Sequence, residues 1–372
     1  MFFRSVISDP GLGSVAAALA ALLVAACAAP TTSPAGPPAA RPSPELTIPV
    51  ARGYHVMAGL GPSLGVWLFG GSTGVPAFGG QVLADTWTHR SSGWIRVGLE
   101  AAPAFSDASL LRRPVATVAD VAYSGRAGRV ILLTISEPEI WLYDPNADRW
   151  EKRPAGQRPA LHGSRAAFDS ESDRVIVFTR SGETWAYDLG ANSWTKKAPQ
   201  ISPPPRAWGG MAYDEGSDRV ILFGGEAGIG LGDTWAYDFN SDSWKDMTPA
   251  KSPPARYYTA MAYEPRSDRI ILFGGVAIGS PGFFPPQERD VPELSPLLGS
   301  EKPRDDTWAY DFDKNTWTAL APATAPGPRA WHAMAHDGKG NVVLFGGGLD
   351  RDHYQADTWT YDLTQNTWSP VR

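Results

Sequence analysis

Residues 203–225 read PPPRAWGGMAYDEGSDRVILFGG, and residues 233–247, which follow shortly after, read DTWAYDFNSDSWKDM. The period of these stretches is two residues rather than 3.6. Residues 221–223 (ILF) form a short apolar run that a pair of glycines ends, whereas residues 235–237 (WAY) alternate large and small side chains. Polar turn residues separate the runs. The unit therefore predicts four short antiparallel strands joined by tight turns.

This unit occurs six times, from residue 49 to the end of the chain. The copies begin at residues 49, 117, 164, 203, 253 and 327. A four-stranded sheet of this kind cannot bury both faces alone, so the copies must stack on one another, and a closed ring protects their edges. The expected fold is all-β, with six antiparallel blades that each contain their own four strands. Such a ring needs no strand exchanged between its two ends.

Four copies carry a pair of glycines, then Trp-x-Tyr-Asp or a variant of it, then a further Trp, and in this they resemble kelch repeats. The pairs are Gly70-Gly71, Gly224-Gly225, Gly274-Gly275 and Gly346-Gly347. The kelch family folds as a β-propeller with one repeat per blade, so the resemblance, which covers residues 49–371, implies a six-bladed kelch-type propeller over residues 49–372. Copies two and three depart from the pattern, with Leu133-Thr134 and Phe178-Thr179 in place of the glycines.

The composition excludes several classes of protein. Of the 372 residues, 43% are hydrophobic and 19% are charged, which excludes global disorder. The formal charge of −6, with no basic stripe, argues against a nucleic-acid partner. The single cysteine, Cys27, excludes an intramolecular disulfide and a thiolate metal cluster.

The N-terminal segment predicts export. Residues 15–26 form an apolar run too short to span a bilayer, and the small residues 24–26 directly precede Cys27. This resembles a bacterial lipoprotein signal, which implies a signal peptide over residues 1–26, lipidation of Cys27, and a protein held at a membrane on the cell surface or in the periplasm. Residues 27–48 would form the lipidated Cys and a Pro/Ala-rich tether. The alternative is an ordinary cleaved signal in which Cys27 has no role.

Twelve of the fifteen tryptophans recur at equivalent positions of the expected third and fourth strands, where we expect them to pack between neighbouring blades. Trp67 is expected in the core. Trp208 and Trp331 instead follow an arginine by two residues at the start of a first strand. In a four-stranded blade, that position lies on the same face as the loop between the second and third strands.

A ligand-binding crescent is therefore predicted on this face, formed by copies four, five, six and one. Its candidate residues are Arg52, Tyr54, His55, Arg206, Trp208, Arg256, Tyr258, Arg329, Trp331 and His332. The alternative for each arginine is an acidic or carbonyl partner that locks neighbouring blades. The long insert of copy five, residues 276–304, offers Phe283 and Phe284 as a lid, or is merely a tolerated insertion.

No catalytic residue, metal or cofactor is predicted. Asp85, Asp233, Asp306 and Asp357 are expected to cap turns. Some kelch-like propellers are copper radical oxidases, but that chemistry needs a cysteine in the propeller, and Cys27 lies outside it. The leading prediction is a monomeric, non-catalytic binding module for a glycan or a protein. The alternative is a carbohydrate-active enzyme, such as a sugar epimerase or mutarotase, in which His55, His332 or Glu226 transfers a proton.

Overall fold

The computed structural model describes residues 48–74, 80–98, 102–103, 118–135, 139–277, 302–350 and 353–371. These residues form the strands β1 to β26 and contain no helix. They belong to one compact unit that spans Pro44–Arg372. No helix that is long and apolar enough to cross a membrane occurs among them.

Each blade is a sheet of four antiparallel strands that are consecutive along the chain, apart from a short two-stranded extension in blade 5. Blades 1 to 3 consist of β1 (Val56–Gly59), β2 (Val66–Ser72), β3 (Val82–Arg90) and β4 (Gly93–Val97); β5 (Val118–Ser124), β6 (Arg129–Thr134), β7 (Glu139–Asp144) and β8 (Arg149–Pro154); and β9 (Arg165–Asp169), β10 (Arg174–Phe178), β11 (Thr184–Asp188) and β12 (Ser193–Lys196). Blades 4 to 6 consist of β13 (Gly210–Asp214), β14 (Arg219–Glu226), β15 (Gly230–Asp238) and β16 (Ser243–Asp246); β18 (Ala260–Glu264), β19 (Arg269–Phe273), β21 (Thr307–Asp311) and β22 (Thr316–Leu320); and β23 (Ala333–His336), β24 (Val342–Phe345), β25 (Thr358–Asp362) and β26 (Thr367–Val371). The extension of blade 5 pairs β17 (Arg256–Tyr257) with β20 (Val276–Ala277).

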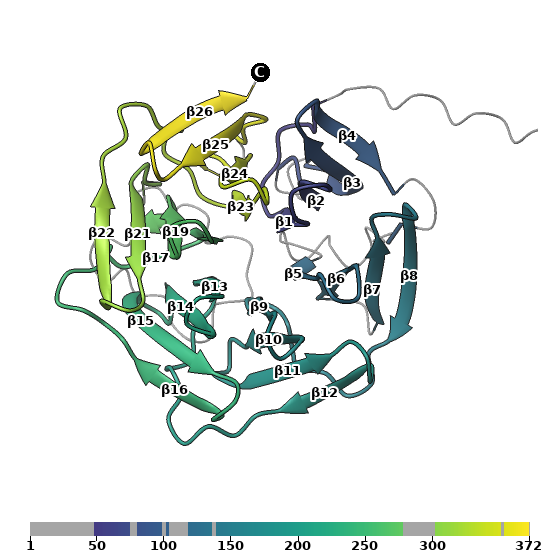
Figure 1. Cartoon of the computed structure of the whole chain (residues 1–372), viewed down its shortest axis with the longest axis vertical. Helices are drawn as coiled ribbons and strands as arrows, with labels where there is room; N and C mark the ends of the chain where they lie inside the picture. The colour runs from purple at the N-terminus through teal and green to yellow at the C-terminus, as the bar shows by residue number, and fades with distance from the viewer. Residues whose placement is uncertain are drawn as a thin grey trace, which may run out of the picture. The chain divides into compact units, whose positions relative to one another are not determined.

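The six blades surround a central axis, with the first strand of each blade innermost (Figure 1). Each inner strand contacts the inner strand of the next blade, and β23 of blade 6 contacts β1 of blade 1, so the ring closes. Because both of these blades are complete in themselves, no strand is exchanged between the ends. The predicted six-bladed, all-β propeller is confirmed.

The recurring tryptophans join the blades. The indole of Trp317 in blade 5 donates to Thr234 Oγ1 of blade 4 at 2.9 Å, and Trp94 of blade 1 donates to Thr358 Oγ1 of blade 6 at 2.8 Å. Apolar cores fill the space between neighbouring sheets, and one of them joins the first and last blades through residues such as Trp94 and Phe345. Trp67 is fully buried, as expected. Sheet-on-sheet packing thus follows from one large flat side chain at the same register position in successive copies.

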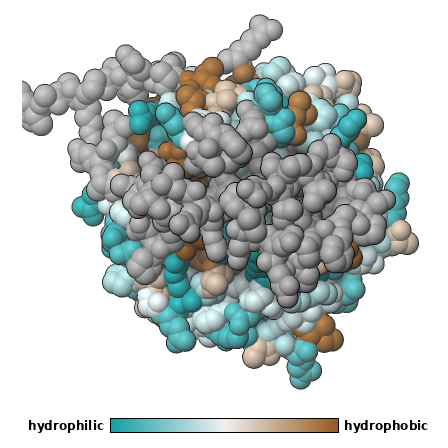
Figure 2. Space-filling view, turned by 180° about the vertical axis from the view of Figure 1, so that it is seen from behind, coloured by the Kyte–Doolittle hydropathy of each residue, from teal (hydrophilic) through white to brown (hydrophobic). Residues whose placement is uncertain are grey.

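Large apolar side chains that are exposed occur singly around the propeller. They are Ile48, Val50, Ile201, Ile229 and Leu349. Where the described surface is visible in Figure 2, hydrophobic residues form separate patches between hydrophilic ones. Scattered residues of this kind are ordinary on a protein surface and do not indicate a binding face.

Candidate functional site

Four of the candidate arginines are held inside their own blades. Arg256 is fully buried and forms a bidentate ion pair with Asp306, with N–O distances of 2.6 and 2.7 Å. Its Nη1 also donates to the Gly274 carbonyl at 2.9 Å, and its Nε donates to the Pro254 carbonyl at 3.0 Å. The same arrangement joins Arg52 to Asp85, Arg206 to Asp233 and Arg329 to Asp357. We call these four pairs the Arg–Asp clamps.

The clamps correct two details of the sequence predictions. Each arginine has the acidic and carbonyl partners of the alternative interpretation, but they lie within its own blade and not in a neighbouring one. Each aspartate is structural, yet it accepts hydrogen bonds from the guanidinium and from the indole two residues later, as Asp306 does from Trp308 at 2.7 Å, instead of capping a turn. Burial alone would raise the pKa of Asp306, but the bonds and charge of Arg256 outweigh it and lower that pKa.

The four candidate aromatic residues adopt an unusual backbone conformation. Tyr54, Trp208, Tyr258 and Trp331 have φ angles of 60°, 56°, 54° and 59°, in the left-handed region that bulky residues rarely enter. Their backbones are linked across blades, since Tyr258 N donates to Trp208 O at 2.9 Å and Tyr54 N donates to Trp331 O at 3.1 Å. The conformation bends the chain between the clamp arginine and the inner strand. A left-handed backbone at a non-glycine residue destabilises the fold by about 1–3 kcal/mol, and residues strained in this way are concentrated at functional sites.

The side chains of these four residues, here called the aromatic cluster, meet on the axis. Tyr258 lies between the others, with ring centroids 5.1 Å from Trp208, 5.5 Å from Trp331 and 5.9 Å from Tyr54. Tyr258 is buried, whereas the other three rings are half-buried. The structure thus brings together the predicted aromatic residues of copies one, four, five and six.

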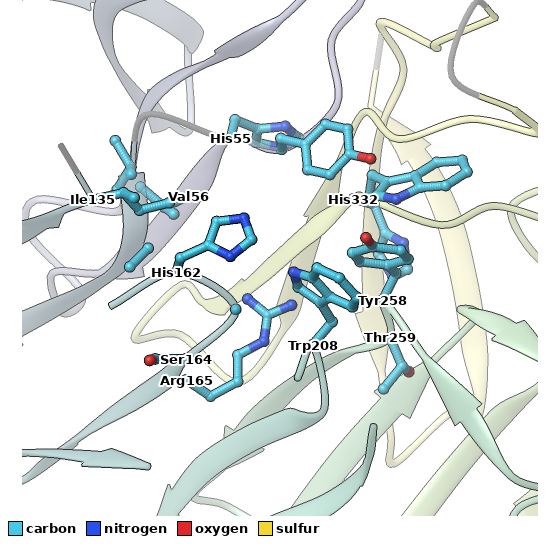
Figure 3. A pocket seen from close by; sticks show the side chains of 15 residues that line it. His55, Val56, Ile135, His162, Ser164, Arg165, Trp208, Tyr258, Thr259 and His332 are labelled. Atoms are coloured by element: carbon cyan, nitrogen blue, oxygen red, sulfur yellow. The ribbon is translucent and has the colours of Figure 1, made fainter. Parts of the chain in front are cut away.

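A pocket of about 70 Å³ opens beside the aromatic cluster where the inner strands begin (Figure 3). Residues from all six blades line it, so it lies at the mouth of the central channel and is not confined to the predicted crescent. The opposite wall comes from blades 2 and 3, where Ile135, His162 and Arg165 contribute. In Figure 3, His162 and Arg165 point into the pocket. Among the described residues, none that lines the pocket carries a carboxylate.

The sequence analysis missed the contribution of blade 3, although a signal for it exists. The motif Ser-Asp-Arg in the first turn aligns copy three with copy four, and this places Gly163 at the position of Trp208 and Arg165 at the position of Gly210. The structure supports the alignment, because Gly163 also has a positive φ, 74°, and its carbonyl accepts from Trp208 N. A glycine therefore replaces an aromatic ring in blade 3, and the arginine two residues later faces the space.

His55 and His332 line the pocket but are held at blade interfaces. His55 lies edge-on to Phe345 of blade 6, and His332 lies edge-on to Phe273 of blade 5. Burial, the charge of Arg52 and that of His332 lower the pKa of His55, and burial with the charge of Arg329 lowers the pKa of His332 to about 3. Both rings are therefore neutral near pH 7. Glu226, the third candidate for proton transfer, is absent from the pocket lining.

Several predictions fall outside the described residues. They concern the signal peptide, Cys27, the tether up to residue 47, and Phe283 and Phe284 in the insert. Of that insert, the described part comprises β20 at its start and residues 302–304 at its end.

The closed ring of six four-stranded blades with an axial pocket defines a repeat-built β-propeller. The family model described as the KLHDC2/KLHL20/DRC7 Kelch-repeats domain matches residues 179–372, slightly more than half of the chain. The chain belongs to the kelch-repeat family, as its repeats predicted. A search of the curated proteins gives no match.

Proposed function

We propose that this protein is a non-catalytic binding module that holds a glycan over the mouth of its central channel. The observation that carries the proposal is the aromatic cluster, four rings from four blades held on the axis at positive φ. Half-buried rings such as Trp208 and Trp331 leave apolar faces that can stack on the C–H face of a sugar. A ligand that stacks on these rings would account for the strained backbone and for the exposed apolar ring faces.

The small volume of the pocket supports a ligand that lies across the mouth of the channel over one that the pocket encloses. A cavity of about 70 Å³ holds only a few water molecules and is small beside the roughly 300–1,000 Å³ of sites that enclose a drug-sized ligand. The ligand would therefore lie across the mouth and insert one substituent. Proton transfer is disfavoured, because His55 and His332 are buried, neutral and packed against phenylalanines.

The test is isothermal titration calorimetry of the full chain with a panel of neutral and acidic oligosaccharides. We expect Trp331→Gly and Trp208→Gly to weaken binding at least about 10-fold, because each removes a stacking surface. Glycine is the suitable replacement, since it accepts the positive φ that alanine would resist.

Trp141→Ala serves as the control, because Trp141 is half-buried but lies outside the pocket. Unchanged glycan binding by both glycine variants would contradict the proposal. Failure of every glycan, together with capture of a protein partner that Trp331→Gly no longer binds, would show that the ligand is a protein. Turnover of a sugar that is lost in His332→Gln would show an enzyme.

The lipid anchor is a proposal that rests on the sequence. The apolar run, the small residues before Cys27 and the proline-rich tether support an exported, membrane-attached protein that presents a monomeric propeller to its ligand. Fractionation tests the anchor: the unaltered chain should stay with membranes after a high-salt wash, and Cys27→Ser should be released. Retention of Cys27→Ser in the membrane fraction would refute it.

A further inference from the structure

We infer that Arg165 and Arg180 of blade 3 form a subsite for an anionic substituent, a carboxylate or a sulfate, on the bound glycan. This inference rests on the proposed function and adds a charge selectivity to it. The subsite lies beside Trp208, on the side of the pocket where blade 3 has Gly163 in place of the repeat's aromatic residue.

The hydrogen bonding of Arg165 distinguishes it from the clamp arginines. Its Nε donates to the Gly209 carbonyl of blade 4 at 2.6 Å, which fixes the position of the side chain. Its two terminal nitrogens have no hydrogen-bond or ion-pair partner among the described residues. The guanidinium points into the pocket (Figure 3), where a ligand oxygen can reach it. In the clamps, by contrast, both terminal nitrogens bind a carboxylate.

Arg180 supplies a second positive charge near the indole ring of Trp208. It follows β10 in a tight turn in which Thr179 N donates to the Glu183 carbonyl and Gly182 N donates to the Thr179 carbonyl. The guanidinium carbon lies 5.7 Å from the centroid of Trp208, within range of a cation–π contact. Arg180 has no ion-pair partner in the part of the chain that the structure describes. Both arginines are half-buried, so water screens their charge less than on an open surface.

One carboxylate, Asp120 of blade 2, lies close enough to influence this region. Its Oδ2 accepts from Ala166 N at 2.8 Å and its Oδ1 accepts from Val121 N at 2.9 Å, so it binds the backbone beside Arg165 and not the guanidinium. Burial raises the pKa of Asp120, and the charge of Arg165 only partly offsets this effect. Asp120 therefore positions the strand that carries Arg165 and leaves the terminal nitrogens available.

The chemistry of the ligand follows from these groups. A guanidinium presents parallel N–H donors that match two oxygens of a carboxylate, and it also binds sulfate oxygens. The aromatic rings next to it favour an anion carried on an apolar ring face over a free inorganic ion. None of the described residues that line the pocket has an acidic side chain that would repel such a group. An acidic sugar residue, such as a uronic acid or a sulfated hexose, meets these requirements.

The experiment compares ligands that differ in charge, two of which share one backbone. The full chain is titrated calorimetrically with an oligogalacturonate, with its methyl ester, which is neutral but keeps the same rings, and with a sulfated galactan of similar length. We expect the galacturonate or the sulfated galactan to bind about 10-fold or more tightly than the ester, and this preference to weaken as salt is raised. The anion that binds more tightly identifies the preferred group.

Variants assign the effect to residues. Arg165→Gln and Arg180→Gln should each remove most of the preference, whereas Arg96→Gln, which removes one exposed positive charge on β4, should not change it. Asp120→Asn should strengthen binding of the charged ligand a few-fold, because it removes a negative charge that interacts with Arg165. Equal affinity for the acid, the sulfate and the ester would overturn the anion subsite while the glycan proposal stands. If the chain bound none of these three ligands and no other glycan, both the anion subsite and the glycan proposal would be overturned.

Discussion

Blades 1, 4, 5 and 6 differ from blades 2 and 3 in what their repeat residues do. In the first group, the arginine that precedes the inner strand is buried in an Arg–Asp clamp, and the residue two positions later is aromatic and has a positive φ. In blade 3, Gly163 replaces that aromatic residue, and Arg165 and Arg180 have no acidic partner among the described residues. The clamp arginines hold the fold of the regular blades, whereas Arg165 of blade 3 lines the pocket and Arg180 lies near Trp208.

The contacts between blades show the same division. In the regular blades the fourth-strand indole donates to a threonine of the preceding blade, as Trp317 does to Thr234. Trp194 of blade 3 has a buried indole nitrogen with no partner, because Ile140 occupies the threonine position in blade 2. The irregular blades are therefore joined by packing alone at a point where the others also have a hydrogen bond. The regular blades thus carry both the Arg–Asp clamps and this hydrogen bond, whereas the half-buried Arg165 and Arg180 belong to blade 3.

The largest expected effect comes from breaking a clamp. Arg256→Gln should lower the free energy of unfolding by about 3 kcal/mol. This value is at the lower end of the usual loss on breaking a buried ion pair, because the Asp306 side chain keeps 30% of its surface exposed. The loss arises mainly because the Asp306 carboxylate and the Gly274 carbonyl lose their donor. Urea unfolding of the full chain, followed by tryptophan fluorescence, measures it through the midpoint.

Arg165→Gln is the matched control for this prediction. Like Arg256→Gln, it removes one positive charge from the propeller. It removes only one hydrogen bond, to the Gly209 carbonyl, so the free energy of unfolding should change by less than about 1 kcal/mol. If the two variants were equally destabilised, the distinction between clamp and pocket arginines would be wrong.

Much of the fold could be predicted from sequence because its signal is repeated. A single stretch such as residues 221–223 is compatible with any buried strand, but six copies with the same turns and tryptophans indicate blades and their number. The position of the aromatic residues on one face followed from strand connectivity. Tyr54, Trp208, Tyr258 and Trp331 do meet there.

An acidic or carbonyl partner for each clamp arginine could be expected from the sequence, but not the residue that supplies it. Arg256 and Asp306 are 50 residues apart, and their pairing depends on how β19 and β21 are registered in the sheet. The pocket wall of blade 3 does not follow from the Arg-x-aromatic pattern, because Arg165 stands where that pattern is absent. Sequence repeats reveal what the copies share, whereas a binding site on the axis depends on how one copy differs.

A smaller effect should separate two tryptophans. Trp317→Phe removes the bond to Thr234 and leaves that buried hydroxyl without its donor, at a cost of about 1 kcal/mol beyond the loss of ring volume. Trp194→Phe removes a similar volume but no hydrogen bond. The difference between the two urea midpoints isolates the hydrogen bond. Equal losses would mean that the blades are held by packing alone throughout the ring.

The smallest effect concerns pH, and it has opposite signs for Asp306 of blade 5 and Asp120 of blade 2. The clamp lowers the pKa of Asp306 below the unfolded value of about 3.9, so its contribution is fully present above that pH and is lost as the pH falls through the folded pKa. Burial raises the pKa of Asp120, so its folded form favours the proton and stability falls as the pH rises through that region. In thermal unfolding between pH 3 and 7, Asp306→Asn should therefore flatten the loss of stability toward acid, and Asp120→Asn should steepen it. A change of the same sign in both variants would contradict the assignment, because folding lowers the pKa of Asp306 and raises the pKa of Asp120.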